Sequence, residues 1–240
     1  MSLTVGVLAL QGGFQEHVTL LRKAADRLSS ANAISAFSAI EVRTPEQLGR
    51  CDALVIPGGE STTISLIATQ TGMMEPLREF VKTSRKPIWG TCAGMILLAD
   101  EANATKKGGQ ELIGGLAVRV RRNHFGRQIE SFVSDIELPF LSPLSTTYPG
   151  VFIRAPIVEE VLAGEGTEGP GERVEVMAVL PGRLRRGGGA AEEQVDAGHA
   201  GDVVAVRQGN IFGTSFHPEL TSDERIHVWW LGEVILALGR

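Results

Sequence analysis

The feature that most constrains the fold is an alternation, over residues 3–102, of apolar runs with segments of helical period. The run 3–10 (LTVGVLAL) is rich in β-forming residues, and two glycines follow it. The segments 39–44, 51–59 and 86–91 predict three more strands. Strands that are buried on both faces of a parallel sheet have this nearly continuous apolar composition.

Helical segments separate these runs. Residues 14–28 carry apolar side chains at helical spacing, residues 62–84 do so with a break near Gly72, and residues 93–102 follow the fourth strand. Strands and helices that alternate with glycine-rich turns predict an α/β fold, in which helices cover both faces of a mostly parallel sheet.

The second half is predicted to add short antiparallel strands and one final helix. Gly209–Asn210 lies between two β-rich runs and predicts a hairpin, and Thr221 with Glu224 predicts a capping box for a helix over 221–239. The predicted strands cover 116–122, 131–138, 150–156, 174–180, 202–208 and 210–216.

Length and composition limit the class of protein. A chain of 240 residues favours one domain over 1–240, and a net charge of -5 argues against a general nucleic-acid binder. Two cysteines do not make a disulfide framework, so both are expected to be reduced. The first apolar run is too short for a secretory signal or a membrane helix, which favours the cytoplasm.

Cys92 is the first candidate for chemistry. The pattern Gly90-x-Cys92-x-Gly94 falls where a predicted strand meets a helix, which is the cysteine counterpart of a nucleophile elbow. There the helix dipole favours the thiolate, and the N–H of Ala93 can point at a developing oxyanion. The alternative is a small buried core thiol.

His217 and Glu219 are the candidate partners of the thiol. In an extended backbone, side chains two residues apart point to the same side, so the carboxylate can orient the imidazole as in a triad. A turn with a solvated Glu219 is the alternative. For His17, His199 and His227 surface or packing roles suffice, whereas the turn residue His124 is harder to dismiss.

A third candidate segment is 55–63 (VIPGGESTT). Gly59 can supply a second oxyanion N–H, and Glu60 and Ser61 can meet the polar end of a substrate. The segment lacks the lysine of a phosphate-binding loop, and an ordinary glycine turn with a serine cap is the alternative.

Taken together, these motifs resemble the triad glutamine amidotransferases. GTCAGM with FHPE carries the general likeness. The stretches GVLALQGGFQEH, PGGESTT, RNHFGRQIESF and VFIRAP narrow it to the glutaminase subunits of pyridoxal 5′-phosphate synthases. The resemblance implies a flavodoxin-like three-layer sandwich and hydrolysis of L-glutamine to glutamate and ammonia.

The resemblance also implies roles for single residues. Cys92 would form a thioester, His217 would move protons, Glu219 would orient His217, and backbone N–H groups of Gly59 and Ala93 would hold the oxyanion. It further implies a glutamine site formed by Glu60, Ser61, Arg122, Ile153 and Arg154, and a loop at Gln11–Gly12 that responds to the partner.

The resemblance implies no metal and no cofactor. Ammonia would pass to a synthase subunit, which makes pyridoxal 5′-phosphate as a product of the complex. Relative to compact members of the family, the segments near 29–38, 139–149 and 163–201 read as surface insertions.

Other readings stay open at this point. The chain could serve another synthase as its glutaminase subunit, or be a cysteine hydrolase on the same scaffold. A partner-binding subunit with an inactive site is a third reading, which the presence of all three triad residues disfavours.

Overall fold

The structure is a computed structural model that describes residues 2–30, 36–103, 110–125, 131–141, 146–162, 173–181 and 201–239. Of the predicted insertions at 29–38, 139–149 and 163–201, the parts 31–35, 142–145, 163–172 and 182–200 fall outside these ranges. Of the first, residues 29–30 end a helix, and 36–38 belong to a strand.

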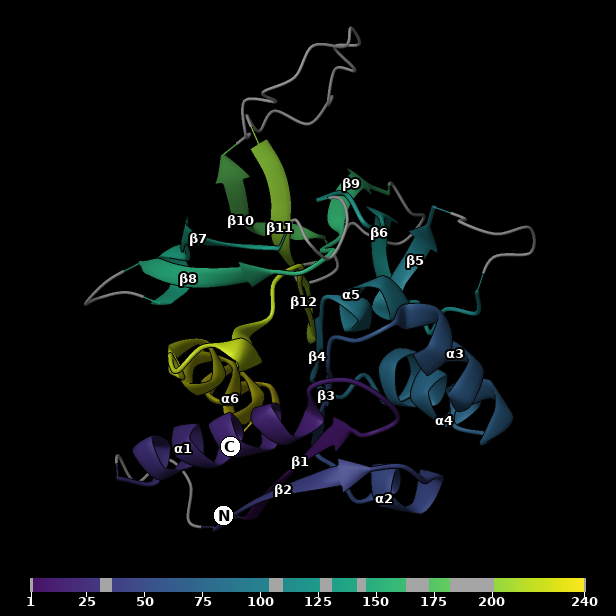
Figure 1. The fold of residues 1–240 in the computed structure, drawn as a ribbon. Coiled ribbons are helices and arrows are strands. Elements are labelled where there is room, and N and C mark those ends of the chain that lie inside the picture. The colour runs from purple at the N-terminus through teal and green to yellow at the C-terminus, as the bar shows by residue number, and fades with distance from the viewer. Residues whose placement is uncertain are drawn as a thin grey trace, which may run out of the picture.

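The first half forms the parallel sheet that the alternation predicts (Figure 1). From one edge its strands run β2-β1-β3-β4-β12, and each neighbouring pair is parallel. This is the 2-1-3-4-5 strand order of flavodoxin-like folds, with β12 in the fifth place. The strands are β1 (Ser2–Leu8), β2 (Ala36–Val42), β3 (Ala53–Ile56), β4 (Ile88–Thr91) and β12 (Ile211–Thr214).

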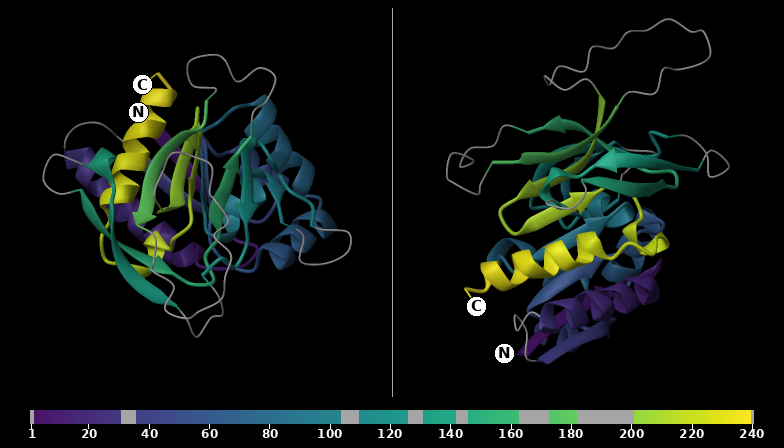
Figure 2. Two further views of the ribbon diagram at one scale, coloured as in Figure 1. Left: turned by 90° about the horizontal axis from the view of Figure 1, so that it is seen from above. Right: turned by 90° about the vertical axis from the view of Figure 1, so that its left-hand side faces the viewer.

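Helices cover both faces of this sheet, which gives three layers (Figures 1 and 2). On one face lie α1 (Phe14–Ser30) and α6 (Arg225–Ala237). The other face carries α3 (Ser61–Gln70), α4 (Met74–Arg78), the π-helical turn η1 (Glu79–Thr83) and α5 (Ala93–Leu98). A short α2 (Pro45–Gly49) follows β2.

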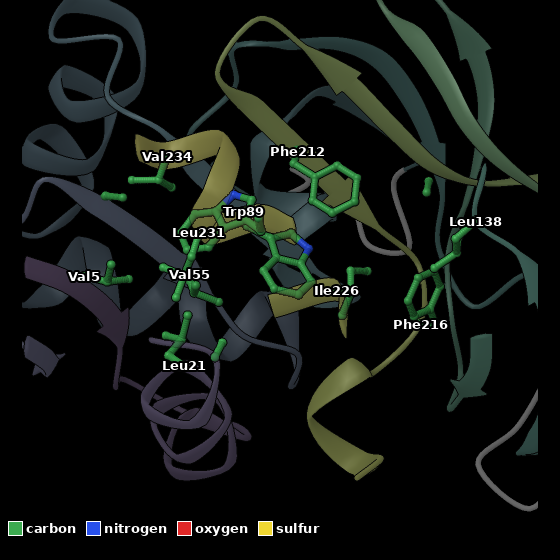
Figure 3. Close-up of a cluster of buried hydrophobic side chains, with 14 of the residues drawn as sticks. Val5, Leu21, Val55, Trp89, Leu138, Phe212, Phe216, Ile226, Leu231 and Val234 are labelled. Atoms are coloured by element: carbon green, nitrogen blue, oxygen red, sulfur yellow. The ribbon is translucent and has the colours of Figure 1, made fainter. Parts of the chain in front are cut away.

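The parallel sheet has an apolar core on each of its two faces, because side chains along each strand point alternately to one face and the other. Val5 and Val55 pack with Trp89, α1 and α6 in one core (Figure 3), whereas Leu54 and Ile56 pack with α3, α4 and α5 in the other. Successive residues of a strand point to opposite faces, so one buried strand serves both cores.

Beyond β12 the sheet becomes mainly antiparallel. It continues through β11 (Gly201–Gln208), β9 (Ile157–Val161), β6 (Leu116–Arg121) and β5 (Ala99–Ala102), and β10 (Glu175–Pro181) pairs with β11. A separate antiparallel pair consists of β7 (Phe132–Glu137) and β8 (Thr147–Phe152). The hairpin expected at Gly209–Asn210 joins β11 to β12, with Gln208 opposite Ile211.

Three local predictions were wrong. The helix expected over 93–102 ends at Leu98, and 99–102 form β5 because they pair with β6. The predicted capping box is absent: helix α6 begins at Arg225 after Glu224, which makes no side-chain cap. Thr221 instead hydrogen-bonds the carbonyl of Pro218. Strand β9, which follows the strand expected at 150–156, was not predicted.

Candidate active site

Four chain segments meet at the carboxyl edge of the parallel strands. They follow β1, β3, β4 and β12, the place where open α/β sheets bind ligands. A cavity of about 680 Å³ opens there. Its lining residues come from these loops, from helices α3 and α5, from the turn after β6 and from the β8–β9 connection: Gln11, Gly59, Glu60, Ser61, Thr62, Thr63, Leu66, Cys92, Ile96, Arg122, Asn123, Ile153, Arg154 and His217.

Cys92 occupies a strained turn between β4 and α5. Its φ is 48° and its ψ is −101°, a backbone conformation that non-glycine residues rarely adopt. A Cβ on Gly94 would lie 2.0 Å from the carbonyl oxygen of Ile56, and a Cβ on Gly90 would lie 2.5 Å from the backbone of Gly94. The flanking glycines therefore allow the helix to start close against two strands, with Cys92 at its N-cap.

His217 and Glu219 lie beside this thiol. His217 Nδ1 is 2.8 Å from Glu219 Oε1, and both side chains are nearly buried. Glu219 thus contacts the imidazole as expected. The backbone is not extended here, however, because Pro218–Leu220 form a 3₁₀ turn, η4. The backbone N–H of His217 donates to the carbonyl of Val151, which fixes the start of this turn.

The charge state of the pair follows from its surroundings. Burial alone would lower the pKa of His217, but its interactions with Cys92 and Glu219, including the charges of both groups, raise it to about 10. Burial would raise the pKa of the Glu219 carboxyl, but His17 and His217 together hold that pKa well below its usual range. An imidazolium between a carboxylate and a thiol is therefore favoured at neutral pH.

Two histidines that were assigned only surface or packing roles are part of this network. His17 and His227 have no exposed surface. His17 Nε2 lies 3.3 Å from Glu219 Oε2, on the side of the carboxylate away from His217. A helical position alone gave no signal of this contact, because it joins residues 202 positions apart.

Glycines bring the loops after β1 and β3 together. Gly12 has a φ of 99°, and a Cβ there would lie 1.7 Å from the carbonyl oxygen of Gly58. The side chain of Gln11 accepts a hydrogen bond from the backbone N–H of Glu60 at 2.8 Å. Gly59 lies directly against Gln11, since a Cβ on it would meet Gln11 Oε1 at 2.2 Å, and both residues line the cavity.

Glu60, rather than a serine, caps helix α3. Its carboxylate accepts hydrogen bonds from the backbone N–H of Thr62 at 3.2 Å and of Thr63 at 2.7 Å. Burial would raise the pKa of this carboxyl, but the hydrogen bonds from Thr63 and Thr62 lower it. Glu60 is therefore a charged group at the cavity edge that also holds the helix start.

Arg122 reaches the cavity beside Ser61. Its Nη1 lies 3.4 Å from Ser61 Oγ and also hydrogen-bonds Gln110 Oε1. The same oxygen of Gln110 accepts from Ser61 Oγ at 3.1 Å. Gln110 thus joins the two predicted substrate residues, and the sequence gives no signal of this role because Gln110 precedes no strand directly and belongs to no motif.

The remaining predicted residues of the glutamine site, Ile153 and Arg154, follow β8. The carbonyl oxygen of Ile153 lies 3.9 Å from Cys92 Sγ, and Arg154 has a φ of 48°. His124 pairs instead with Asp202 at 3.1 Å, away from the thiol. His199 lies outside the described residues.

Within the described part of the chain, no three His, Cys, Asp or Glu side chains are grouped so as to hold a metal ion. The site is built from a thiol, a buried imidazole and a carboxylate, beside backbone N–H groups and an arginine. A cysteine at an elbow with a histidine and an acid at its side is the arrangement of thiol-dependent acyl transfer, in which the thiolate attacks a carbonyl.

The comparisons with known proteins define this class more closely. The chain belongs to the SNO glutamine amidotransferase family, which it matches over residues 7–236. A crystal structure of a glutamine amidotransferase superposes with a TM-score of 0.68 at 40% identity, covering 96% of this chain and 98% of that one. The resemblance expected from the motifs is thus confirmed.

Curated relatives from bacteria and a plant are named as subunits of pyridoxal 5′-phosphate synthases. A protein of Streptomyces avermitilis, "Pyridoxal 5′-phosphate synthase subunit PdxT", is 46% identical over 93% of this chain and 90% of its own. An Arabidopsis thaliana protein named "Probable pyridoxal 5′-phosphate synthase subunit PDX2" is 44% identical over 95% and 85%. The glutaminase domain of a Trypanosoma brucei CTPS, at 12% identity and a TM-score of 0.51, shares the fold.

Proposed function

We propose that this chain is the glutaminase subunit of a pyridoxal 5′-phosphate synthase. It hydrolyses L-glutamine to glutamate and ammonia, and a synthase subunit uses the ammonia. The observation that carries the proposal is the placement of Cys92 at a strained elbow beside the His217–Glu219 pair, at the mouth of one cavity. The names of the relatives at 44% and 46% identity support this synthase over others.

The first half-reaction forms a thioester. The thiolate of Cys92 attacks the side-chain amide carbon of glutamine, and the carbonyl π electrons move to oxygen. The His217 imidazolium then gives its proton to the amide nitrogen, the C–N bond breaks, and ammonia leaves. The raised pKa of His217 supports this role, because the proton is already on the ring when the thiolate attacks.

The second half-reaction restores the thiolate. His217, now neutral, takes a proton from a water molecule as the oxygen attacks the thioester carbon. The C–S bond breaks, the imidazolium–thiolate pair forms again, and the carboxylic acid that leaves gives its proton to solvent to become glutamate. Glu219 stays ionised throughout and orients the ring through Nδ1.

Backbone donors are proposed to hold the oxyanion in both steps. Ala93 is the first residue of α5, so its N–H has no acceptor inside the helix. Gly59 offers a second N–H from the opposite side of the cavity. The Gln11–Gly12 loop, which lies directly against Gly58 and Glu60, is proposed to respond to the synthase partner.

The polar groups across the cavity are suited to the amino-acid end of glutamine. A guanidinium binds an α-carboxylate in a bidentate manner, and a carboxylate can receive the α-ammonium. We assign the first role to Arg122 and Arg154 and the second to Glu60, with Ser61 and the Ile153 backbone completing the site. All of these residues line the cavity.

We place the reaction in the cytoplasm. None of the helices in the described ranges has the length and apolar character needed to cross a membrane. Cys51 and Cys92 are both unpaired, as a thiol nucleophile requires, and reducing compartments keep such thiols free.

The test is glutamate release from glutamine, with and without the synthase subunit, for the wild type, Cys92→Ala and Cys51→Ala. Cys51 is a buried thiol whose pKa burial raises to about 11, so it is a matched control that removes the other sulfur. We expect partner-stimulated release from the wild type and Cys51→Ala and none from Cys92→Ala. Equal release from wild type and Cys92→Ala would refute the proposal.

A further inference from the structure

Glu219 contacts one buried imidazole, and that imidazole contacts a second one. Neither ring lines the cavity. His17 is on α1 and His227 on α6, the two helices that share one face of the sheet. His17 Nδ1 is 3.0 Å from His227 Nε2, and His17 Nε2 is 3.3 Å from Glu219 Oε2. His17 Nε2 is also 3.3 Å from Thr91 Oγ1, the residue before the nucleophile.

Packing alone does not explain two imidazoles here. Both rings lie against Trp89 in an otherwise apolar core, at centroid distances of 5.7 Å and 4.9 Å. Burying polar rings in such a core costs free energy unless their nitrogens find partners. Apolar side chains of the same size would fill this space without that cost, so the nitrogens themselves need an explanation.

The proton positions follow from the contacts. Glu219 is a carboxylate, so its Oε2 requires a donor, and His17 Nε2 is the ring nitrogen beside it. His17 Nδ1 and His227 Nε2 lie 3.0 Å apart, and we take His227 Nε2 as the donor of this hydrogen bond. That leaves His227 Nδ1 without a proton, which fits its place among the buried atoms that have no hydrogen-bond partner in the described residues, because a buried N–H there would be unsatisfied.

We propose that His17 is a positioning residue for the glutaminase reaction, holding the second oxygen of Glu219 so that the first stays directed at His217, with His227 fixing the His17 tautomer. This inference deepens the proposed function and rests on it. His17 touches neither the cavity nor the reacting atoms; it acts only through Glu219.

The arrangement has a mechanical consequence. Without His17, the carboxylate of Glu219 is free to rotate about its last torsion, because Oε2 has no hydrogen-bond partner among the described residues and the 3.3 Å contact with His17 Nε2 is what holds it. His217 then loses its fixed orientation toward Cys92. The loss falls on the chemical steps and leaves the arginines and Glu60, which bind the substrate, unchanged.

The test compares His17→Leu, His17→Gln and Leu21→Ala in the full chain with its synthase subunit. Gln can place an amide N–H near the position of Nε2, whereas Leu cannot. Leu21 is fully buried one helical turn further along α1, so Leu21→Ala loosens the same helix without removing a donor. Rates are expressed per folded chain, with the folded fraction of each variant taken from its denaturant unfolding curve.

We expect His17→Leu to lower kcat about tenfold or more, with KM for glutamine changed less than about twofold. We expect His17→Gln to recover most of that loss, and Leu21→Ala to keep the wild-type kcat. An unchanged kcat in His17→Leu would overturn the proposal. So would a loss that Leu21→Ala reproduces or that His17→Gln fails to restore.

A measurement on the wild type keeps the proposal testable if the variants do not fold. In ¹⁵N-histidine NMR spectra at neutral pH we expect a proton on Nε2 of both His17 and His227, and none on Nδ1 of His227. An unprotonated Nε2 on His17 overturns the inference. Failure of the glutaminase proposal is seen separately, as a wild type whose glutamate release does not depend on Cys92.

Discussion

At the scale of single residues, the site depends on how closely the backbone approaches the side chains. Gly58 is buried between His217 and Cys92, and a Cβ on it would lie 2.4 Å from His217 Cε1 and 3.3 Å from Cys92 Cβ. The imidazole cannot move aside freely for such a Cβ, because it is held by Glu219. The glycine thus sets the space in which the ring and the thiol meet.

Gly58→Ala is therefore expected to displace the imidazole and lower kcat for glutamine hydrolysis at least about tenfold, with a smaller effect on stability. Steady-state kinetics with the synthase subunit measure this. Gly49→Ala is the matched control, because a Cβ at Gly49 meets nothing within 4 Å. A Gly58→Ala enzyme with wild-type kcat would contradict the prediction.

The titration of His217 gives a second prediction at this scale. Because the pKa of His217 is raised from about 6.5 to about 10, its charged form stabilises the folded chain fully below pH 6.5. That contribution is lost as the pH rises through 10. We expect the difference in unfolding free energy between wild type and His217→Asn to shrink steadily between pH 7 and pH 10.

Urea unfolding of both proteins at several pH values in this range measures the difference. Glu219 works in the opposite sense, since its lowered pKa gives stability that is present above its usual range and lost in acid. A difference between wild type and His217→Asn that stays constant from pH 6 to pH 10 would count against the raised pKa.

At the scale of elements, the loops that carry the site are tied to the starts of helices. Helix α3 begins where Glu60 accepts two backbone hydrogen bonds, and α5 begins at Cys92. The first backbone N–H groups of a helix have no acceptor within it, so they are available to a capping carboxylate or to a ligand. The same helix geometry thus stabilises the element and supplies donors to the cavity.

Substitutions of Glu60 test both roles of this helix start, the stability of α3 and its contribution to the cavity. We expect Glu60→Ala to lower the free energy of unfolding by about 1 kcal/mol and to raise KM for glutamine. Aspartate is itself a good N-cap, so Glu60→Asp should keep most of the stability. Chemical denaturation and kinetics on both variants measure this, and equal stability of wild type and Glu60→Ala would exclude the capping role.

At the scale of the whole molecule, the sheet is divided between a parallel half that carries the site and an antiparallel half beyond β12. Strands β10 and β11 pair up to Pro181 and Gly201, where the described chain is interrupted. The two ends of this interruption are thus neighbours across a ladder. We propose one domain with an insertion in 163–201. The chain can be shortened at this place to test that proposal without altering the parallel or the antiparallel half of the sheet.

Replacing residues 182–200 by a two-residue Asn-Gly turn is expected to leave glutaminase activity and the midpoint of thermal unfolding nearly unchanged. Pro181 and Gly201 already face each other, so a tight turn can close the hairpin. Differential scanning calorimetry and the coupled glutaminase assay give the readouts. A chain that fails to fold, or loses stimulation by the synthase subunit, would show that the segment is more than an insertion.

Sequence reasoning succeeded where structure depends on residues close together along the chain. Apolar runs predicted the parallel strands, paired glycines predicted the turns, and the Gly-x-Cys-x-Gly pattern predicted the elbow. It was less successful near the ends of elements. Residues 99–102 continue a helical pattern, yet they form β5 because β6 lies beside them. A distant strand outweighs local propensity in such cases.

The sequence by itself therefore determined the fold class, the family, and the location of Cys92, His217 and Glu219 at the ends of strands. Only the tertiary structure decided that His17 and His227 lie behind Glu219 and that Gln110 joins Ser61 to Arg122. The physical reason is that periodicity and turn chemistry are local, whereas a buried hydrogen bond needs two groups that the packing of helices and sheet brings together.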